Sequence, residues 1–472
     1  MGYHPGLEDD GVYLTAVKAN LNPALFPHDS DFYRLQLQAT VFDGWVAHFV
    51  RWTGIPIAWT ELFWQFLSLF LILWASRRIA KRLFAEPVAQ WAAVSMVAAM
   101  FTLPVAGTAL TIADQYLHPR NLATALVLIA ISRIADGLRW QTVPWLVLAF
   151  ALHPIMAAFG ISFCIFLMLS SLERVPGGLR ALKGSLAAAV PLGWIFEPAT
   201  PAWREALHTR PYFFLGRWTW YEWLGALAPL FLFGLLWRLA SRHGEGRLAR
   251  FALAVFAYAV FQQIAATAML TPDALERLTP LQPMRYLQLV YIFLALAGGG
   301  LLGRFVVKER LWRWTLFLLA INGGMFLVQW GVFDDGAGLD AHLELPWTKS
   351  ANPWLEAFGW VRQNTPVDAY FALDPGYMAA TGEGFRSFRA LAERSQLSDG
   401  IKDTVVVTQV PSLAPVWRRQ QLAQAGWSHF QLADFGRLKR EFGVDWALVS
   451  YPAPVGLDCK WHNEALAVCR IP

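Results

Sequence analysis

Long apolar runs alternate with short polar connections through the middle of the chain. The runs fall at about residues 55–76, 88–110, 120–135, 143–172, 184–197, 219–237, 249–270, 286–303 and 312–333. A helix needs about 20 residues to cross a bilayer. The run 143–172 is too long for one crossing, and His153-Pro154 interrupts it, where proline breaks the preceding helix. We therefore interpret this run as two short helices, 143–153 and 155–172, which gives ten membrane helices in all.

Basic residues are divided unequally between the two sets of connections. If residues 1–54 lie outside, the inside connections between the spans hold 17 Lys and Arg and the outside connections hold six. Lys and Arg favour the cytoplasmic side. A single crossing by 143–172 would move the basic loop 174–183 outside, so the charge count also favours the hairpin. Both ends of the chain and the His153-Pro154 turn are therefore predicted to lie outside.

Composition supports the same class of protein. The chain is 56% hydrophobic and 15% charged, whereas soluble domains carry about 25% charged residues. The net charge of +5 does not indicate a nucleic-acid partner, because the basic residues are spread through short loops without forming a stripe. We expect a multi-pass membrane protein surrounded by the lipid bilayer.

The segment before the first span is predicted to be an outer loop. Acidic residues outnumber basic ones in residues 1–54 by six to three. The stretch FYRLQLQATVFDGWVAHFVRW, 32–52, has apolar residues at roughly helical spacing, which predicts one amphipathic helix on the membrane surface. Asp29, Ser30 and Asp31 stand directly before it and are residue types that cap helices.

The periodicity changes after about residue 334. We predict strands in AYFALDP, TVVVTQV, DWALVSYP and LAVCRI, and helices in PWLEAFGWVRQNTP, PVWRRQQLAQAG and FGRLKREFG. This alternation favours one small α/β domain. The predicted fold is therefore mainly α: an outer loop 1–54, a membrane bundle 55–333 and an extramembrane α/β domain 334–472. Cys459 and Cys469 could pair if this domain faces an oxidising compartment, a point that the sequence leaves open.

This layout, together with the stretches LEDDGVYL, NPALFPHDSDF, QYLHPRN, ALHPIMA, LQPMRYLQ, WVRQNTPVDAYFALDP and FRALAERS, resembles the GT-C superfamily of membrane glycosyltransferases. It resembles in particular a bacterial multi-pass family of uncharacterised function grouped near them. The resemblance implies sugar transfer from a polyprenyl-phosphate donor at the outer face of a bacterial inner membrane. It leaves the acceptor open.

The start of the chain departs from that family. Such proteins usually begin with a membrane helix that leads into the acidic loop, and neither a signal peptide nor such a helix precedes LEDDGVYL here. We expect that Met1 lies inside the first outer loop and that a helix is encoded upstream. The alternative is an acidic tail that is translocated as it stands.

Three acids near the start are the candidates for proton transfer. The resemblance makes Asp9 or Asp10 the base that takes the proton of the acceptor hydroxyl, with Glu8 as the third candidate. The alternative is that these carboxylates cap a helix beginning near Gly11.

The departing phosphate needs positive charge, which arginine supplies well. Arg120 lies in the second outer loop with Asp114, Arg285 starts a membrane helix on the outer side, and His153 sits at the hairpin turn. The alternatives are interfacial snorkelling for the arginines and helix capping for the histidine.

Two further groups have weaker predictions. Asp29 and Asp31 have the DxD form and could bind a divalent cation such as Mg²⁺ or Mn²⁺, although capping is favoured. Arg386, Arg389 and Arg394 are predicted to form a basic surface or a partner contact.

Two other classes of function stay open. A transporter places ionisable groups in the middle of broken membrane helices, and the middles of these spans are nearly free of charge. This argues against ion coupling but leaves a lipid flippase possible. The other class is a non-catalytic membrane scaffold derived from a transferase.

Sidedness can be measured directly. A single cysteine placed near either terminus should react with a membrane-impermeant maleimide added to the outer face, and one in the loop 238–250 should react only after permeabilisation. Labelling of either terminus from the cytosolic side would contradict the predicted orientation.

Overall fold

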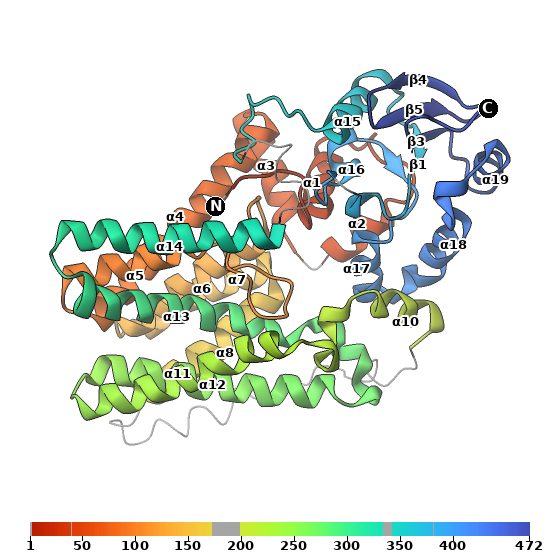
Figure 1. Cartoon of the computed structure of the whole chain (residues 1–472). Helices are drawn as coiled ribbons and strands as arrows, with labels where there is room; N and C mark the ends of the chain where they lie inside the picture. Colours follow the sequence, from red (N-terminus) through yellow and green to blue (C-terminus); the bar gives the residue numbers. More distant parts are fainter. Residues whose placement is uncertain (1, 39, 172–198, 334–341, 381) are drawn as a thin grey trace.

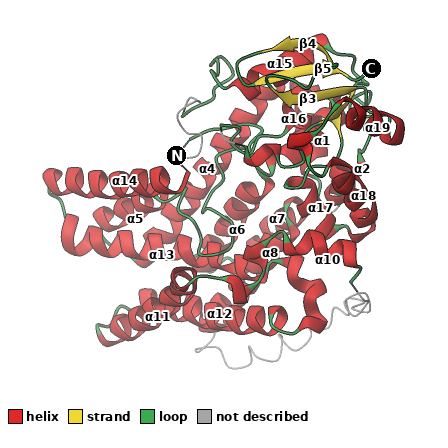
Figure 2. Ribbon diagram, turned by 45° about the vertical axis from the view of Figure 1, so that its right-hand side comes forward, coloured by secondary structure: helices red, strands yellow, loops and turns green. Residues whose placement is uncertain are grey.

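The computed structural model describes residues 2–38, 40–171, 199–333, 342–380 and 382–472. Helices dominate it, and strands are confined to one small sheet formed by the last part of the chain (Figure 2). The predicted class, a mainly helical protein with a C-terminal α/β region, is confirmed at this level.

A bundle of apolar helices forms one end of the molecule (Figure 1). Its described helices are α4 (Ile57–Leu83), α5 (Pro87–Ala99), α6 (Pro119–Ala135), α7 (Val143–Leu152), α8 (Pro154–Ser171), α11 (Trp220–Arg242), α12 (Gly246–Leu270), α13 (Leu287–Leu302) and α14 (Leu311–Phe333). Within the described ranges, five helical segments are long and apolar enough to cross a membrane: Ile57–Leu83, Trp220–Arg242, Gly246–Leu270, Pro283–Val307 and Leu311–Gln329. The count of ten crossings stays a prediction, and its segment 184–197 lies outside the described residues.

The predicted break in the long apolar run is confirmed, because α7 ends at Leu152 and α8 begins at Pro154. Glycines bring two other helices of the bundle close together. A Cβ on Gly299 of α13 would lie 2.7 Å from the carbonyl oxygen of Ala92 in α5, and one on Gly300 would lie 2.1 Å from the Phe84 ring. The Gly298-Gly299-Gly300 run therefore packs helices rather than forming a loop, as small residues do in membrane bundles.

The remaining helices gather at the opposite end of the molecule (Figure 1). They are α1 (Asp10–Leu21), α2 (Asp31–Leu37), α3 (Phe42–Thr53), α10 (Pro201–His208), α15 (Pro353–Asn364), α16 (Phe388–Ala392), α17 (Lys402–Gln409), α18 (Ala414–Gln424) and α19 (Leu432–Phe442).

The single amphipathic helix predicted for 32–52 is wrong, since α2 and α3 are separate helices. Between them, Thr40 Oγ1 donates to the carbonyl oxygen of Leu152 at 2.7 Å, and the Val41 amide donates to Ala151 at 3.1 Å. These contacts with the end of α7 hold the chain out of the helical conformation. Thr40 Oγ1 also accepts from the Phe42 amide at the start of α3.

A mixed five-stranded sheet completes the fold, in the order β2-β1-β3-β5-β4. Its strands are β1 (Tyr370–Ala372), β2 (Ser395–Gln396), β3 (Trp446–Ser450), β4 (Asp458–His462) and β5 (Leu466–Arg470). β1 pairs with β2 and β3 in parallel, and β5 pairs with β3 and β4 antiparallel. The predicted strands in AYFALDP, DWALVSYP and LAVCRI are confirmed, and the predicted helices in this region correspond to α15, α18 and α19.

The strand predicted in TVVVTQV is wrong, because this stretch belongs to helix α17. Asp399 Oδ1 accepts from the backbone amides of Ile401 and Lys402, at 2.8 and 2.5 Å, and so caps the first turn. Val406 and Val407 are buried in the same apolar core as the bundle helices. Capping and burial together outweigh the preference of valine for strands.

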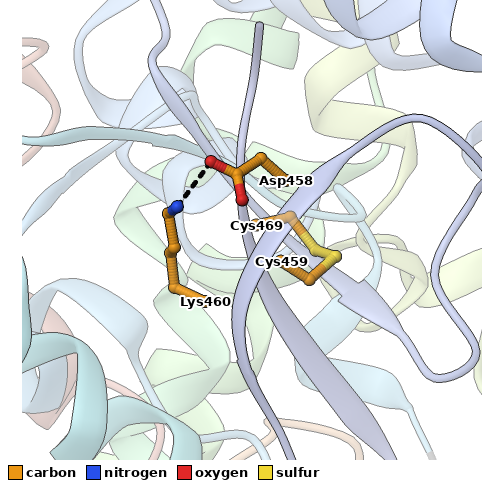
Figure 3. The surroundings of a disulfide bond; sticks show 4 residues. All are labelled: Asp458, Cys459, Lys460 and Cys469. Carbon is orange, nitrogen blue, oxygen red and sulfur yellow. Dashed lines mark ion pairs between the residues drawn. A yellow bond between two sulfur atoms is a disulfide. The ribbon is translucent and has the colours of Figure 1, made fainter.

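Cys459 and Cys469 form a disulfide that joins β4 to β5 (Figure 3). Lys460 and Asp458 make an ion pair of 2.6 Å beside it. The pairing that the sequence left open is therefore present.

The first segment of the chain packs directly on the C-terminal region. Lys18 of α1 donates to the carbonyl oxygen of Ala390 and to Glu393 Oε1, both at 2.7 Å. The Ser387 amide donates to the carbonyl oxygen of Gly6 at 3.1 Å. The two ends of the sequence therefore form one layer over the same end of the bundle.

Gly299→Ala should destabilise the bundle by about 1–3 kcal/mol, because the added methyl group overpacks against the α5 backbone. Thermal unfolding in detergent would measure this as a lower midpoint. Gly298→Ala is the matched control, since a Cβ there meets nothing within 4 Å. Equal midpoints for the two variants would contradict the close α5–α13 contact.

Candidate functional site

A cavity of about 300 Å³ lies where the bundle meets the layer of N-terminal and C-terminal segments. Its charged and histidine side chains come from six places in the chain: Glu8 and Asp9, His118 and Arg120, His153, Arg210, Arg285, and Lys402. Tyr13, Tyr212 and Phe385 contribute aromatic rings, and the rest of the lining is mainly apolar. This mixture is typical of a pocket that binds a small molecule in one orientation.

Asp9 is the carboxylate at the centre of the ionic contacts in this cavity. Its Oδ1 lies 3.2 Å from Lys402 Nζ, and its Oδ2 lies 3.7 Å from His118 Nε2. Burial by itself would raise the pKa of Asp9, but Lys402, His118 and Arg120 together hold it well below its ordinary value. Asp9 is therefore ionised at neutral pH, and 32% of its side chain stays exposed to the cavity.

His118 is held in one tautomer by the start of helix α6. Its Nδ1 accepts from the Arg120 backbone amide at 2.9 Å, which caps the helix ahead of Pro119. Burial and the nearby Arg120 charge lower the pKa of His118, so the ring is neutral near pH 7. Because Nδ1 is the acceptor, the proton resides on Nε2, which faces Asp9.

Arg120 is fixed by a buried polar network. Its guanidinium donates to both oxygens of Asp114, with Nε to Oδ2 at 3.0 Å and Nη2 to Oδ1 at 2.6 Å. The Asn121 side chain accepts from the Asp114 amide, and Gln65 of α4 donates to the Asp114 carbonyl oxygen. Nη1 of Arg120 has no hydrogen-bond partner within the described residues. Asp114 thus positions Arg120 from behind and does not itself line the cavity.

Arg285 is a second guanidinium in the cavity, placed by the short turn Pro283–Tyr286 that leads into α13. Its side chain makes no hydrogen bond or ion pair with any described residue. Arg210 enters from the loop after α10 and donates to the carbonyl oxygen of Ile401. The lining carries four cationic side chains and two carboxylates. Because Asp114 behind the lining already pairs with Arg120, one positive charge is left in excess for an anion.

The other candidates from the acidic cluster have different positions. Glu8 lines the cavity and pairs with Lys402. Asp10 points away from it, because its Oδ2 accepts from the Gly6 amide at 2.6 Å, and burial raises the pKa of Asp10 to about 7. Asp9 takes the N-cap position of α1 without making a side-chain capping hydrogen bond. The cluster is thus divided between the cavity and the interior.

His153 caps a helix and also lines the cavity. Its Nδ1 accepts from the Met156 amide at 3.4 Å, at the start of α8, and its ring also lines the cavity. The centres of the His153 and His118 rings are 6.0 Å apart. The hairpin turn therefore lies beside the acidic cluster.

The candidate cation ligands do not converge. Asp29 Oδ2 accepts from Tyr370 Oη and from Gln420 Nε2, and Asp31 lies exposed in the first turn of α2. Among the residues that the structure describes, no group of three His, Cys, Asp or Glu side chains has the arrangement of a metal site. The divalent cation therefore stays a prediction without a ligand set to support it.

The predicted basic surface at Arg386, Arg389 and Arg394 is wrong, because all three side chains are buried. Arg389 donates to both oxygens of Asp403, at 2.6 and 2.8 Å. Arg394 donates to the carbonyl oxygen of Thr365 at 2.6 Å. Basic residues that cluster in a sequence can be buried if the fold brings acidic partners to them. The cluster by itself therefore does not indicate a surface.

Sequence reasoning missed the contribution of the C-terminal region to the cavity. Lys402 was not singled out, although it contacts both Glu8 and Asp9 across 394 and 393 residues of sequence. Tyr212, which also lines the cavity, was not singled out either. The one available signal was Asp399, three residues before Lys402, which marks a helix start that presents Lys402 in its first turn.

Comparisons with known proteins give little further information. No family model and no curated protein matches the chain. One similar solved structure is the archaeal oligosaccharyltransferase AglB from Archaeoglobus fulgidus in complex with an inhibitory peptide and a dolichol-phosphate. The TM-score is 0.34 and the identity 14%, over 95% of this chain and 66% of that chain. The chain thus spans about two thirds of that protein's length, and a likeness at this level assigns neither family nor activity.

Arg285→Ala should weaken binding of farnesyl phosphate to the purified full chain by about tenfold or more, since a charge-assisted hydrogen bond contributes roughly 1.5–3 kcal/mol. Titration calorimetry would measure the affinity. Arg242→Ala at the far end of α11 is the matched control and should bind as the wild type does. Equal affinities for Arg285→Ala and the wild type would remove Arg285 from the anion site.

Proposed function

We propose that the protein is a membrane glycosyltransferase that transfers a sugar from a polyprenyl-phosphate donor to an acceptor hydroxyl at the outer face of a bacterial inner membrane. The observation that carries the proposal is the cavity in which the ionised Asp9 faces an excess of guanidinium and ammonium groups, with Arg285 unpaired within the described residues. A carboxylate beside a phosphate-binding cluster is what this reaction requires.

The roles follow from the geometry of the cavity. Arg120 and Arg285 bind the donor phosphate, and Asp114 keeps Arg120 oriented. The acceptor oxygen forms a bond to the anomeric carbon, while the bond from that carbon to the phosphate oxygen breaks and its electron pair leaves with the phosphate. The hydroxyl proton passes to the carboxylate of Asp9.

Lys402 links donor binding to the strength of the base. A carboxylate with a low pKa is a weak base, and Lys402 and His118 keep the pKa of Asp9 low. An entering phosphate attracts Lys402, which weakens its contact with Asp9 and raises the pKa of that carboxylate. The base therefore strengthens when the donor is in place.

Two observations support placing the cavity outside the cytosol. The Cys459–Cys469 disulfide is of a kind that persists in oxidising compartments. The basic connections lie at the other end of the bundle. Arg77–Arg82, for example, belong to the C-terminal end of α4, whereas its N-terminal end meets the layer that covers the cavity (Figure 1). The partners proposed are the lipid-linked sugar and the bilayer.

A lipid flippase and a non-catalytic scaffold are the alternatives. A flippase would bind the same lipid phosphate and would not need Asp9, whereas a scaffold would need neither the unpaired Arg285 nor the cavity. Substitution of Asp9 therefore distinguishes a transferase from the two alternatives, because only the transferase needs this carboxylate.

Asp9→Asn should lower transfer by about 100-fold or more, because general-base catalysis contributes roughly 10²–10⁴ in rate. Transfer from an undecaprenyl-phosphate-linked sugar would be followed in vesicles that contain each variant. Asp458→Asn on β4 is the control for the loss of one surface carboxylate, and farnesyl phosphate binding confirms that the variant is folded. Turnover of Asp9→Asn at the wild-type rate would remove the catalytic assignment.

A further inference from the structure

A second hollow of about 1030 Å³ lies between the three helices of the first outer segment, α1, α2 and α3. It adjoins the cationic cavity, because Thr40 lines both. Thr40 is also the residue tied to the end of α7 at Leu152, beside the hairpin turn. The two hollows are therefore neighbours separated by one short stretch of chain.

The outer hollow, which we call the groove, is lined by aromatic side chains and planar polar groups together. Tyr33 and Trp45 contribute rings, and Asn20 Nδ2 donates to Asp43 Oδ2 at 2.7 Å along one wall. The side chains of Arg34 and His48 are exposed in it. Aromatic side chains next to amide, carboxylate and guanidinium groups suit a ligand with many hydroxyls and apolar C–H faces.

The charge of the groove differs from that of the cavity. Among its lining residues one guanidinium, Arg34, balances one carboxylate, Asp43. The cavity lining holds four cationic side chains against two carboxylates. An anionic ligand is therefore favoured in the cavity, and a neutral one is accommodated in the groove without an unpaired charge.

We propose that the groove binds the acceptor and that the acceptor is a neutral, hydroxyl-rich glycan. This inference rests on the proposed transferase function, since it gives the second substrate of the same site. The glycan lies across α3, and its terminal hydroxyl passes Thr40 to reach Asp9. The donor and acceptor thus enter from different hollows and meet at the acidic cluster.

Gly44 allows the groove to be filled without disturbing the fold. It lines the groove within α3, and a Cβ there meets nothing within 4 Å. Replacing glycine inside a helix does not cost helical stability. Gly44→Trp is therefore the blocking variant, and Gly359→Trp in α15 is its control, because a Cβ at Gly359 also meets nothing within 4 Å.

The experiment is saturation-transfer NMR on the purified full chain, with maltohexaose and hexa-N-acetylchitohexaose as neutral glycan probes. Saturation should reach at least one of them in the wild type and in Gly359→Trp, and should fall at least fivefold in Gly44→Trp. Arg34→Ala with His48→Ala should also weaken it, since both side chains lie exposed in the groove.

Three outcomes would overturn the inference. The first is that neither glycan receives saturation, and the second is that Gly44→Trp and the wild type give equal saturation. The third is that Gly44→Trp blocks the binding of a neutral Gly-Ser peptide but not that of a glycan. Farnesyl phosphate binding to the same preparations tests the cavity separately and should be unchanged in Gly44→Trp. If the wild type does not bind farnesyl phosphate, the proposed donor site is wrong. The glycan result tests the acceptor groove independently.

Discussion

The contact of Lys402 with Glu8 and Asp9 ties together two segments that are nearly 400 residues apart in sequence. Burial opposes the charge of Lys402, but the two carboxylates together raise its pKa, so the ammonium group stays charged. Removing Lys402 would leave these two carboxylates without their shared counter-ion, which is unfavourable. The layer over the bundle, and the cavity beneath it, depend on this balance of charges.

The same balance explains how the cavity can be charged and still stable. Arg120 is neutralised by Asp114, whose backbone is held by Asn121 and Gln65, so the position of Arg120 does not depend on a ligand. Arg285 has no such partner among the described residues, and it stands where an anion would lie. One guanidinium is therefore preorganised by the protein, and the other is left available for binding.

Under the proposed function, two adjoining hollows of different charge separate the two substrates. The cationic cavity lies where the bundle meets the layer that covers it, and the neutral groove lies among helices α1, α2 and α3. Thr40 borders both, and its hydrogen bond to Leu152 fixes that border against α7.

Local sequence signals were reliable for elements whose conformation depends mainly on their own residues. Proline at 154 broke the long apolar run, and the alternating strands at 446–450 and 466–470 were recognised. They failed where distant residues intervened. Valine-rich TVVVTQV became a helix because Asp399 caps it and the bundle core buries it, and the helix expected over 32–52 was divided by contacts with Ala151 and Leu152.

The sequence by itself determined the bundle of apolar helices, the break at Pro154 and the presence of acids and arginines in the connecting segments, because hydropathy, proline and charge act through short stretches of chain. Only the tertiary structure decided which of those side chains meet. Asp9 and Asp10 are neighbours in sequence, yet one faces Lys402 and the other faces Gly6. Arg389 was drawn into the interior by Asp403, while Arg285 was left facing the cavity. These outcomes depend on the positions of partners far along the chain, and no local pattern carries that information.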